Sequence, residues 1–140
     1  MAIWNKDLNL EEINKFNQKT ILEHIDIKIT DYTDDELIGT MPVNSQTHQP
    51  YGILHGGASC VLAESLGSIA SNLCLNTSKQ YAVGLEINAI HVRPVKSGLV
   101  RGVAKNIHLG KTTHIWDIKI YNEENKLVCI SRLTMAVVNH

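Results

Sequence analysis

Residues 56–75, with the sequence GGASCVLAESLGSIASNLCL, decide the fold of this 140-residue chain. They are rich in Ala, Leu and Ser and poor in β-branched residues, and they begin at a pair of glycines, so they predict one helix. Apolar or small residues occupy nearly every position around it. We therefore expect a helix that is buried on almost all sides and that the rest of the chain must cover.

The segments on both sides of this helix predict strands. After it, residues 81–92, 98–109, 113–121 and 126–138 are strand-like and are separated by turn residues. Before it, residues 25–32 and 36–43 predict a hairpin, and residues 10–24 predict a first helix with a capping pair, Asn9 and Glu12. The expected fold class is α+β, with an antiparallel sheet of about six strands wrapped around a long central helix in one domain, residues 1–140.

The composition argues against several classes of function. Thirteen Lys and Arg residues against 14 Asp and Glu give a net charge of −1, which favours neither a nucleic acid nor a membrane surface as partner. No apolar run approaches the ~20 residues of a transmembrane helix, and the acidic N-terminal segment is unlike a signal peptide, so we expect a cytoplasmic protein. Cys60, Cys74 and Cys129 lack paired spacing and are interpreted as small buried hydrophobic residues. No metal or cofactor is predicted.

Glu64 is the only charged residue between positions 37 and 78, where an even spread would place about eight. Small residues at helical spacing share its face, which would let a ligand or another chain come close. Partial burial would make the carboxylate a stronger base. The alternative is a glutamate that extends into solvent or bonds to Ser68. The residues of the predicted face are Gly57, Cys60, Val61, Gly67, Ser68 and Ser71.

The start of the same helix is the second candidate site. The backbone amides of Gly56 and Gly57 lie where unpaired N–H groups and the helix dipole can stabilise an oxyanion. Gln49 and His55 flank this position and could orient a carbonyl group with side-chain donors. The alternative is a glycine-rich helix cap with a histidine that merely packs.

The two candidate sites are too far apart to act together within one chain. Eight residues separate Gly56 from Glu64, and along a helix this is ~12 Å. If both act on one carbonyl, they belong to different chains. The spacing therefore predicts a homodimer in which the helix start of one copy faces Glu64 of the other.

Other catalytic motifs are missing. The chain has no nucleophile elbow, phosphate-binding loop, dinucleotide fingerprint or H-E-x-x-H pair, so serine hydrolase, NTPase, dehydrogenase and metalloprotease interpretations have no support.

Three stretches of the chain resemble the hotdog-fold acyl-CoA thioesterases. They are THQPYGILHGGASCVLAESLGS at 47–68, GLEINAIHVRPVKSGLVRG at 84–102 and IHLGK at 107–111. The resemblance begins at IWNKDLNLEEIN, residues 3–14, and covers essentially the whole chain. It is strongest to the group that hydrolyses 1,4-dihydroxy-2-naphthoyl-CoA in menaquinone synthesis or proofreads aryl carrier proteins in enterobactin synthesis.

The resemblance implies a hotdog fold that pairs into dimers and usually into tetramers. It implies that Glu64 is the nucleophile or the general base and that Ser68 helps to place Glu64 or the attacking water. The amide of Gly56, assisted by Gln49 and His55, would polarise the thioester carbonyl from the facing subunit.

The resemblance also implies contacts to coenzyme A, which is part of the substrate. They fall on Gly84, on the His91-Val92-Arg93 turn and on His108, Gly110 and Lys111. Arg93 and Lys111 are suitable partners for phosphate. One departure is Val92, where members of the family often have a second histidine.

The expected reaction is hydrolysis of an aromatic acyl-CoA or aryl carrier-protein thioester. Val61, Leu62 and Tyr51 are the expected apolar wall for the acyl group. Two alternatives remain at this point: a hotdog hydratase or dehydratase, and a non-catalytic module that binds acyl-CoA or a carrier protein.

Overall fold

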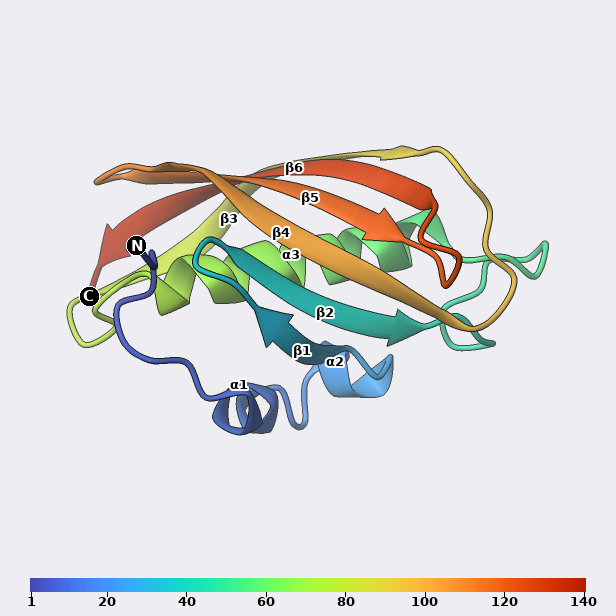
Figure 1. The fold of residues 1–140 in the computed structure, drawn as a ribbon, viewed down its shortest axis with the longest axis horizontal. Coiled ribbons are helices and arrows are strands. Elements are labelled where there is room, and N and C mark those ends of the chain that lie inside the picture. Colours follow the sequence, from blue (N-terminus) through green and yellow to red (C-terminus); the bar gives the residue numbers. More distant parts are fainter.

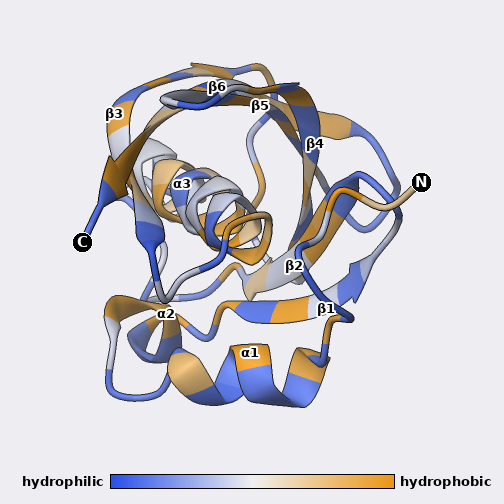
Figure 2. Cartoon of the chain, turned by 90° about the vertical axis from the view of Figure 1, so that its left-hand side faces the viewer, coloured by the Kyte–Doolittle hydropathy of each residue, from blue (hydrophilic) through white to orange (hydrophobic).

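Helix α3, Gly56–Leu73, lies at the centre of the computed structural model, which describes residues 1–140 (Figure 1). The predicted central helix is confirmed, and it ends two residues earlier than expected. Cys74 caps it with a backbone N–H that donates to the carbonyl oxygen of Ala70. Viewed along its axis, α3 lies inside the curve of the sheet (Figure 2).

Six antiparallel strands form one sheet around α3, as the sequence predicts. Their order across the sheet is β1-β2-β4-β5-β6-β3, so β1 and β3 are the two edges. The later strands end within one residue of the predicted positions. The strands are β1 Lys28–Tyr32, β2 Glu36–Pro42, β3 Gln80–His91, β4 Leu99–Leu109, β5 Thr113–Tyr121 and β6 Leu127–Asn139.

The helix packs closely against the concave face of the sheet. A Cβ atom at Gly102 in β4 would lie 2.6 Å from Cδ1 of Leu66, so only glycine allows this approach. Trp116 of β5 is fully buried, and its indole N–H donates to the hydroxyl of Ser71 over 2.7 Å. This buried hydrogen bond fixes the helix against the middle of the sheet.

One face of α3 is open, so the prediction of a helix buried on nearly all sides is wrong for the single chain. Glu64 and Gly57 are exposed on this face. Gly67 and Ser71, three and seven residues after Glu64, are buried, so only part of the predicted face is open. The reason is that the sheet curves around only one side of the helix.

The N-terminal segment forms two short helices where one was predicted. Helix α1 covers Leu10–Phe16 and α2 covers Ile21–His24. Lys19 between them has a positive φ of 60°, which a helix cannot contain. Thr20 then starts α2, because its hydroxyl accepts the N–H of Leu22. The predicted cap at Asn9 is confirmed, since its side chain accepts the N–H of Glu12.

Both edge strands bond to an asparagine side chain. On β1, the amide of Asn14 accepts the N–H of Ile29 over 2.8 Å and donates to its carbonyl over 2.8 Å. On β3, Asn72 accepts the N–H of Ala82 over 2.9 Å and donates to its carbonyl over 3.2 Å. Asn14 thereby attaches α1 to β1, and Asn72 attaches α3 to β3.

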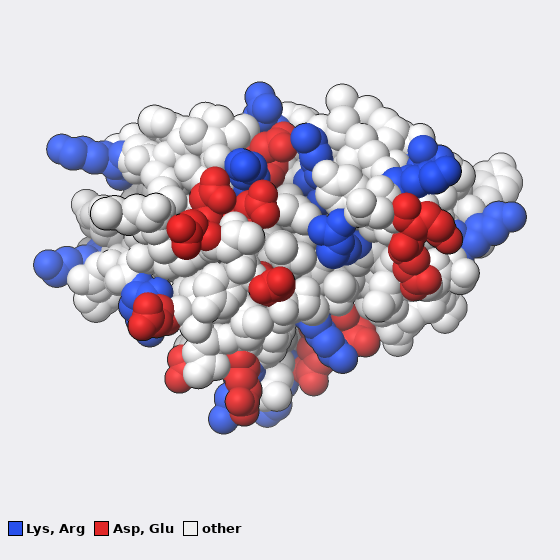
Figure 3. Space-filling model, viewed as in Figure 1, with Lys and Arg blue, Asp and Glu red and all other residues white.

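Acidic and basic side chains lie next to one another on the face of the molecule seen in Figure 3, and no large patch of one sign forms there. This agrees with the near-zero net charge. None of the helices has the length and apolar character that a membrane crossing requires.

Candidate active site

The start of α3 leaves one backbone amide free. His55 caps the helix, and its Nδ1 accepts the N–H of Gly57 over 2.7 Å. The N–H of Gly56 makes no hydrogen bond within the chain. Of the two amides that the sequence offers as oxyanion donors, Gly57 is therefore occupied and Gly56 is available. Because Nδ1 accepts, the proton of neutral His55 is on Nε2, which can still donate.

The free amide of Gly56 opens onto a small cavity of about 390 Å³. Gln49 lines the same cavity, and its side-chain oxygen accepts the N–H of Tyr51. Its NH₂ group remains available as a donor. The imidazole ring of His91 lies against Gly56: a Cβ atom added at Gly56 would be 2.8 Å from Nε2 of His91. Val92 and Arg93 complete this group, which the structure brings together from three separate segments.

Glu64 lies further along α3, on its open face. Its carboxylate is exposed and makes no hydrogen bond or ion pair, including none with Ser68. This agrees with the surface-glutamate alternative as far as one chain is concerned. Gly84 of β3 is its neighbour, because a Cβ atom there would lie 2.5 Å from Oε2 of Glu64. Ser68 is one helical turn away and lines a hollow of about 220 Å³ together with Glu64 and Leu22.

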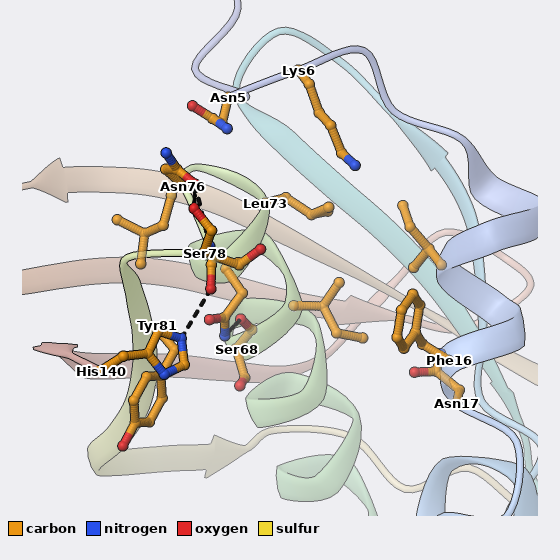
Figure 4. Close-up of a pocket in the computed structure, with 15 residues that line it drawn as sticks. Asn5, Lys6, Phe16, Asn17, Ser68, Leu73, Asn76, Ser78, Tyr81 and His140 are labelled. Atoms are coloured by element: carbon orange, nitrogen blue, oxygen red, sulfur yellow. Dashed lines mark hydrogen bonds between the residues drawn. The ribbon is translucent and has the colours of Figure 1, made fainter.

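A larger cavity of about 720 Å³ adjoins this hollow (Figure 4). The two share Asn17, Ser68 and Ile69 as lining residues. The large cavity lies between α1 and the C-terminal half of α3, and Phe16 forms part of its wall. The sequence did not reveal it, because segments far apart in the chain enclose it and no local pattern marks them.

Of the three residues of the expected apolar wall for the acyl group, Leu62 is not accessible to a ligand. Leu62 is fully buried and faces the sheet. Tyr51 is exposed in the loop before α3, five residues before Gly56. Val61 is half-buried. The apolar side chains that line the hollow beside Glu64 are those of Leu22 and Ile69.

The predicted coenzyme A contacts lie at two opposite ends of the chain. The His91-Val92-Arg93 segment lies at the end where α3 starts. His108, near the end of β4, and Gly110 and Lys111, in the β4–β5 turn, lie at the other end (Figure 1). Gly84 lies between them, beside Glu64. A single chain therefore holds the candidate residues in three separate groups.

No cysteine is a candidate nucleophile. Burial raises the pKa of the Cys74 thiol to about 12 and that of Cys129 to about 11. The pKa of Cys60 is also raised, first by burial and then by the negative charge of Glu64 one turn away. Thiols with raised pKa values are protonated at neutral pH and react poorly. Cys129 is buried as expected, whereas Cys60 and Cys74 are half-buried.

Comparison with known proteins decides the family, because residues 51–129 match the model of the thioesterase superfamily. The chain belongs to the thioesterase superfamily. It is 48% identical over 136 residues to the 1,4-dihydroxy-2-naphthoyl-CoA hydrolase of Escherichia coli, covering 97% of this chain and 99% of that protein. It is 47% identical over 136 residues to a proofreading thioesterase of Cronobacter turicensis, covering 97% and 98%.

The solved structures agree with this membership of the thioesterase superfamily. A mutant thioesterase from Pseudomonas aeruginosa has a TM-score of 0.98 and 50% identity, and the match covers 99% of this chain and 100% of that one. A thioesterase from Haemophilus influenzae has a TM-score of 0.95 and 46% identity, with 99% and 96% covered. The hotdog fold is thereby confirmed, and the protein is an enzyme that hydrolyses thioesters.

Proposed function

We propose that this thioesterase hydrolyses aromatic acyl-CoA or aryl carrier-protein thioesters at sites shared by two copies of the chain. The observation that carries the proposal is the separation of two unpaired groups on one helix. The N–H of Gly56 and the exposed carboxylate of Glu64 both lack a partner within the chain, and they lie ~12 Å apart along α3.

The open edge of β3 is the surface on which a second copy fits. At Ala82 the N–H and the carbonyl are already occupied by Asn72, so pairing can begin only beyond it. A bulge between Gly84 and Glu86 then changes which residues face the edge. The N–H of Val92, the residue after the end of β3, donates to the carbonyl of Val128 in β6. The backbone N–H and C=O groups of the even-numbered residues in this part of β3 therefore face β6. The free edge groups therefore belong to Ile87, Ala89 and His91.

Two-fold pairing of this free segment would close the gap between the two candidate sites. If the edge from Leu85 to His91 pairs with its copy so that Asn88 of the two chains lie opposite each other, His91 of one chain lies opposite Leu85 of the other. His91 is beside Gly56, and Leu85 follows Gly84, which is beside Glu64. The amide of one copy and the carboxylate of the other would then flank one substrate. Leu85 and Ile90 of β3 are 63% and 60% exposed, and pairing would cover apolar surface of this kind.

In this arrangement the thioester carbonyl oxygen accepts the N–H of Gly56 at the positive end of the α3 dipole. Glu64 of the other copy either attacks the carbonyl carbon or removes a proton from a water that attacks it. In both routes the C–S bond breaks, coenzyme A or the carrier leaves as the thiol, and the acyl group leaves as the acid. Gln49 and His55 add side-chain donors around the carbonyl.

The aromatic substrate class is supported by the relatives and by the walls beside Glu64. One relative is named a hydrolase of 1,4-dihydroxy-2-naphthoyl-CoA, which carries a fused aromatic acyl group. Ile69 lines both the hollow beside Glu64 and the larger cavity, and Phe16 lines the latter. Arg93 and Lys111 are the proposed phosphate partners, and neither forms an ion pair within the chain.

The first experiment removes the proposed oxyanion donor. Gly56 is the first residue of α3, a position where proline is favoured, and His55 before it has ψ of 130°, which proline tolerates. Gly56→Pro deletes the N–H and should lower kcat for a naphthoyl-CoA substrate by about 10²–10³-fold. Gly56→Ala is the matched control, because it brings the same Cβ atom against His91 but keeps the N–H. Equal kcat losses in the two variants would contradict the proposed role.

The second experiment tests sharing of the site. Glu64→Gln should abolish most release of free thiol, as Gly56→Pro does. A dimer that contains one chain of each variant has one of its two sites with both groups intact. Random pairing on co-expression makes half of the dimers mixed, so roughly a quarter of wild-type turnover should return. If each site lay within one chain, mixing would restore nothing. A Glu64→Gln variant with wild-type turnover would refute the proposed function itself.

A further inference from the structure

The large cavity shown in Figure 4 changes character along its length. Phe16, Ser68 and Asn17 lie at one end of it, toward Glu64. At the other end, Asn5, Lys6, Asn76 and Ser78 gather around the C-terminal end of α3. The cavity therefore begins beside the proposed reacting group, where Ile69 and Phe16 form apolar walls, and ends among polar side chains.

Lys6 is the only Lys, Arg, Asp or Glu among the fifteen residues that line this cavity. Its ammonium group forms no ion pair and no hydrogen bond with the protein. Figure 4 shows its side chain extending from the N-terminal segment into the cavity. Lys6 is exposed at the edge of the cavity, so water screens its charge and its attraction for an anionic oxygen is modest.

The backbone around Lys6 is held in place. Asn5 donates its N–H to the carbonyl oxygen of Leu73, the last residue of α3, over 2.9 Å. The indole of Trp4 donates to the carbonyl of Thr33 over 2.8 Å. Ile3 donates its backbone N–H to Asp34 over 2.9 Å. Three successive residues before Lys6 are thus fixed, and the position from which its side chain starts is fixed with them.

We propose that Lys6 is a specificity-determining residue that binds a carboxylate or another anionic oxygen on the distal part of the acyl group. The inference rests on the proposed function, because it places the thioester carbonyl beside Glu64. Ser68 and Asn72 then lie ~6 and ~12 Å further along the helix axis. An acyl group with a fused or para-substituted aromatic system extends in this direction, and its far substituent approaches Lys6.

A simpler role for Lys6 makes a different prediction. A cation near the last carbonyl groups of α3 would be stabilised by the negative end of the helix dipole without any ligand. In that case replacing Lys6 would lower the melting temperature and would change the hydrolysis of all substrates equally. The substrate dependence of the effect therefore distinguishes binding from a structural role.

The test compares two substrates that differ only at the distal position: 2-naphthoyl-CoA and 6-carboxy-2-naphthoyl-CoA. Lys6→Met removes the charge and keeps the length of the side chain, and Lys6→Arg keeps the charge. Lys79→Met is the matched control, because Lys79 is exposed and lies outside the cavity lining. We expect Lys6→Met to lower kcat/KM for the carboxylated substrate by about fivefold, with the unsubstituted substrate and the Lys79 variant unchanged.

An equal effect of Lys6→Met on both substrates, or no effect on either, would overturn the inference. Retention of the preference in Lys6→Arg would support it. If wild-type protein hydrolyses neither thioester, the proposed function fails, whatever the role of Lys6. The role of Lys6 is then tested by measuring the binding of 2-naphthoate and 2,6-naphthalenedicarboxylate by calorimetry. Tighter binding of the dicarboxylate that is lost in Lys6→Met supports the inference, and equal binding of the two acids overturns it.

Discussion

Gly84 determines where the carboxylate of Glu64 can lie. A Cβ atom at this position would be 2.5 Å from Oε2, closer than two such atoms can approach, so any other residue displaces the carboxylate. The neighbour comes from β3, the strand that carries the open edge. The position of the proposed catalytic acid is therefore coupled to the strand on which the second copy is proposed to pair.

Gly84→Ala should lower kcat by displacing Glu64 while leaving the melting temperature within a few degrees of wild type, because the displaced group is exposed. The loss should be smaller in a Glu64→Asp background, where the shorter acid leaves room for the methyl group. Measuring kcat for both single variants and the double variant gives the coupling. Additive losses would argue against direct contact between the two positions.

His114 makes stability depend on pH. It is 3% exposed, and its Nδ1 has no hydrogen-bond partner. Burial, and secondly the positive charge of His108, lowers its pKa below the usual value of 6.5. Between the lowered pKa and 6.5, His114 is therefore mostly protonated in the unfolded chain and mostly neutral in the folded chain. The free energy of unfolding should therefore fall as the pH drops below 6.5, until the pH reaches the lowered pKa.

Urea unfolding at several pH values between 5 and 8 checks this expectation. Wild type should lose more stability toward low pH than His114→Leu, which cannot be protonated. His24→Gln, a change at an exposed histidine, serves as the control and should behave like wild type. Parallel pH profiles for wild type and His114→Leu would show that His114 is not responsible.

The candidate residues differ in how visible they are in the sequence. Glu64 stands out because no other charge lies near it in the chain, whereas Gly56 is marked only by a Gly-Gly pair at the start of the apolar stretch, which is a weaker signal. Lys6 and Phe16 carry no such signal. Their role depends on a cavity that forms only when the N-terminal segment packs on α3, and sequence spacing does not encode that packing.

At the scale of elements, the later strands could be predicted closely and the first helix could not. Alternating residues and turn signals define β3 to β6 locally. Between residues 10 and 24 the helical pattern continues across Lys19, but the backbone there adopts a positive φ and the side chain of Glu23 accepts its N–H. Phe16, the last residue of α1, is 87% exposed, although its apolar character predicts a buried face.

Asn14 is the main connection between α1 and the sheet, and its removal gives an element-scale prediction. Asn14→Ala breaks two hydrogen bonds to Ile29 and one to Leu10. The free energy of unfolding should fall by about 1–3 kcal/mol, because the groups of Ile29 lose their partners. Gln18→Ala removes an exposed amide that makes no side-chain bond and should change stability little. Urea unfolding of both variants gives the comparison.

At the scale of the whole molecule, the proposed dimer can be tested through the edge of β3. The N–H of Ala89 faces away from β6, so proline there leaves the bonds of the single chain intact and blocks pairing with a second copy. Ala89→Pro should be monomeric by light scattering and should lose most thioesterase activity. The expected tetramer, two such pairs, would be lost with it.

Leu85→Asp tests the same surface without changing the backbone, since Leu85 is largely exposed in one chain. Tyr32→Asp, at the opposite edge on β1, is the control and should keep the mass and activity of wild type. A monomer with full activity would contradict the shared site. Circular dichroism identifies any variant that has simply failed to fold.

The two asparagines at the sheet edges also bear on aggregation. An unpaired strand edge can recruit strands from other molecules without limit. Pairing through β3 uses one edge of each copy and leaves β1 outermost on both sides. On β1 the bonding groups of Ile29 are already occupied by Asn14, so a further strand finds no continuous row to join. Assembly through the sheet edges should therefore stop at two chains rather than grow into a filament.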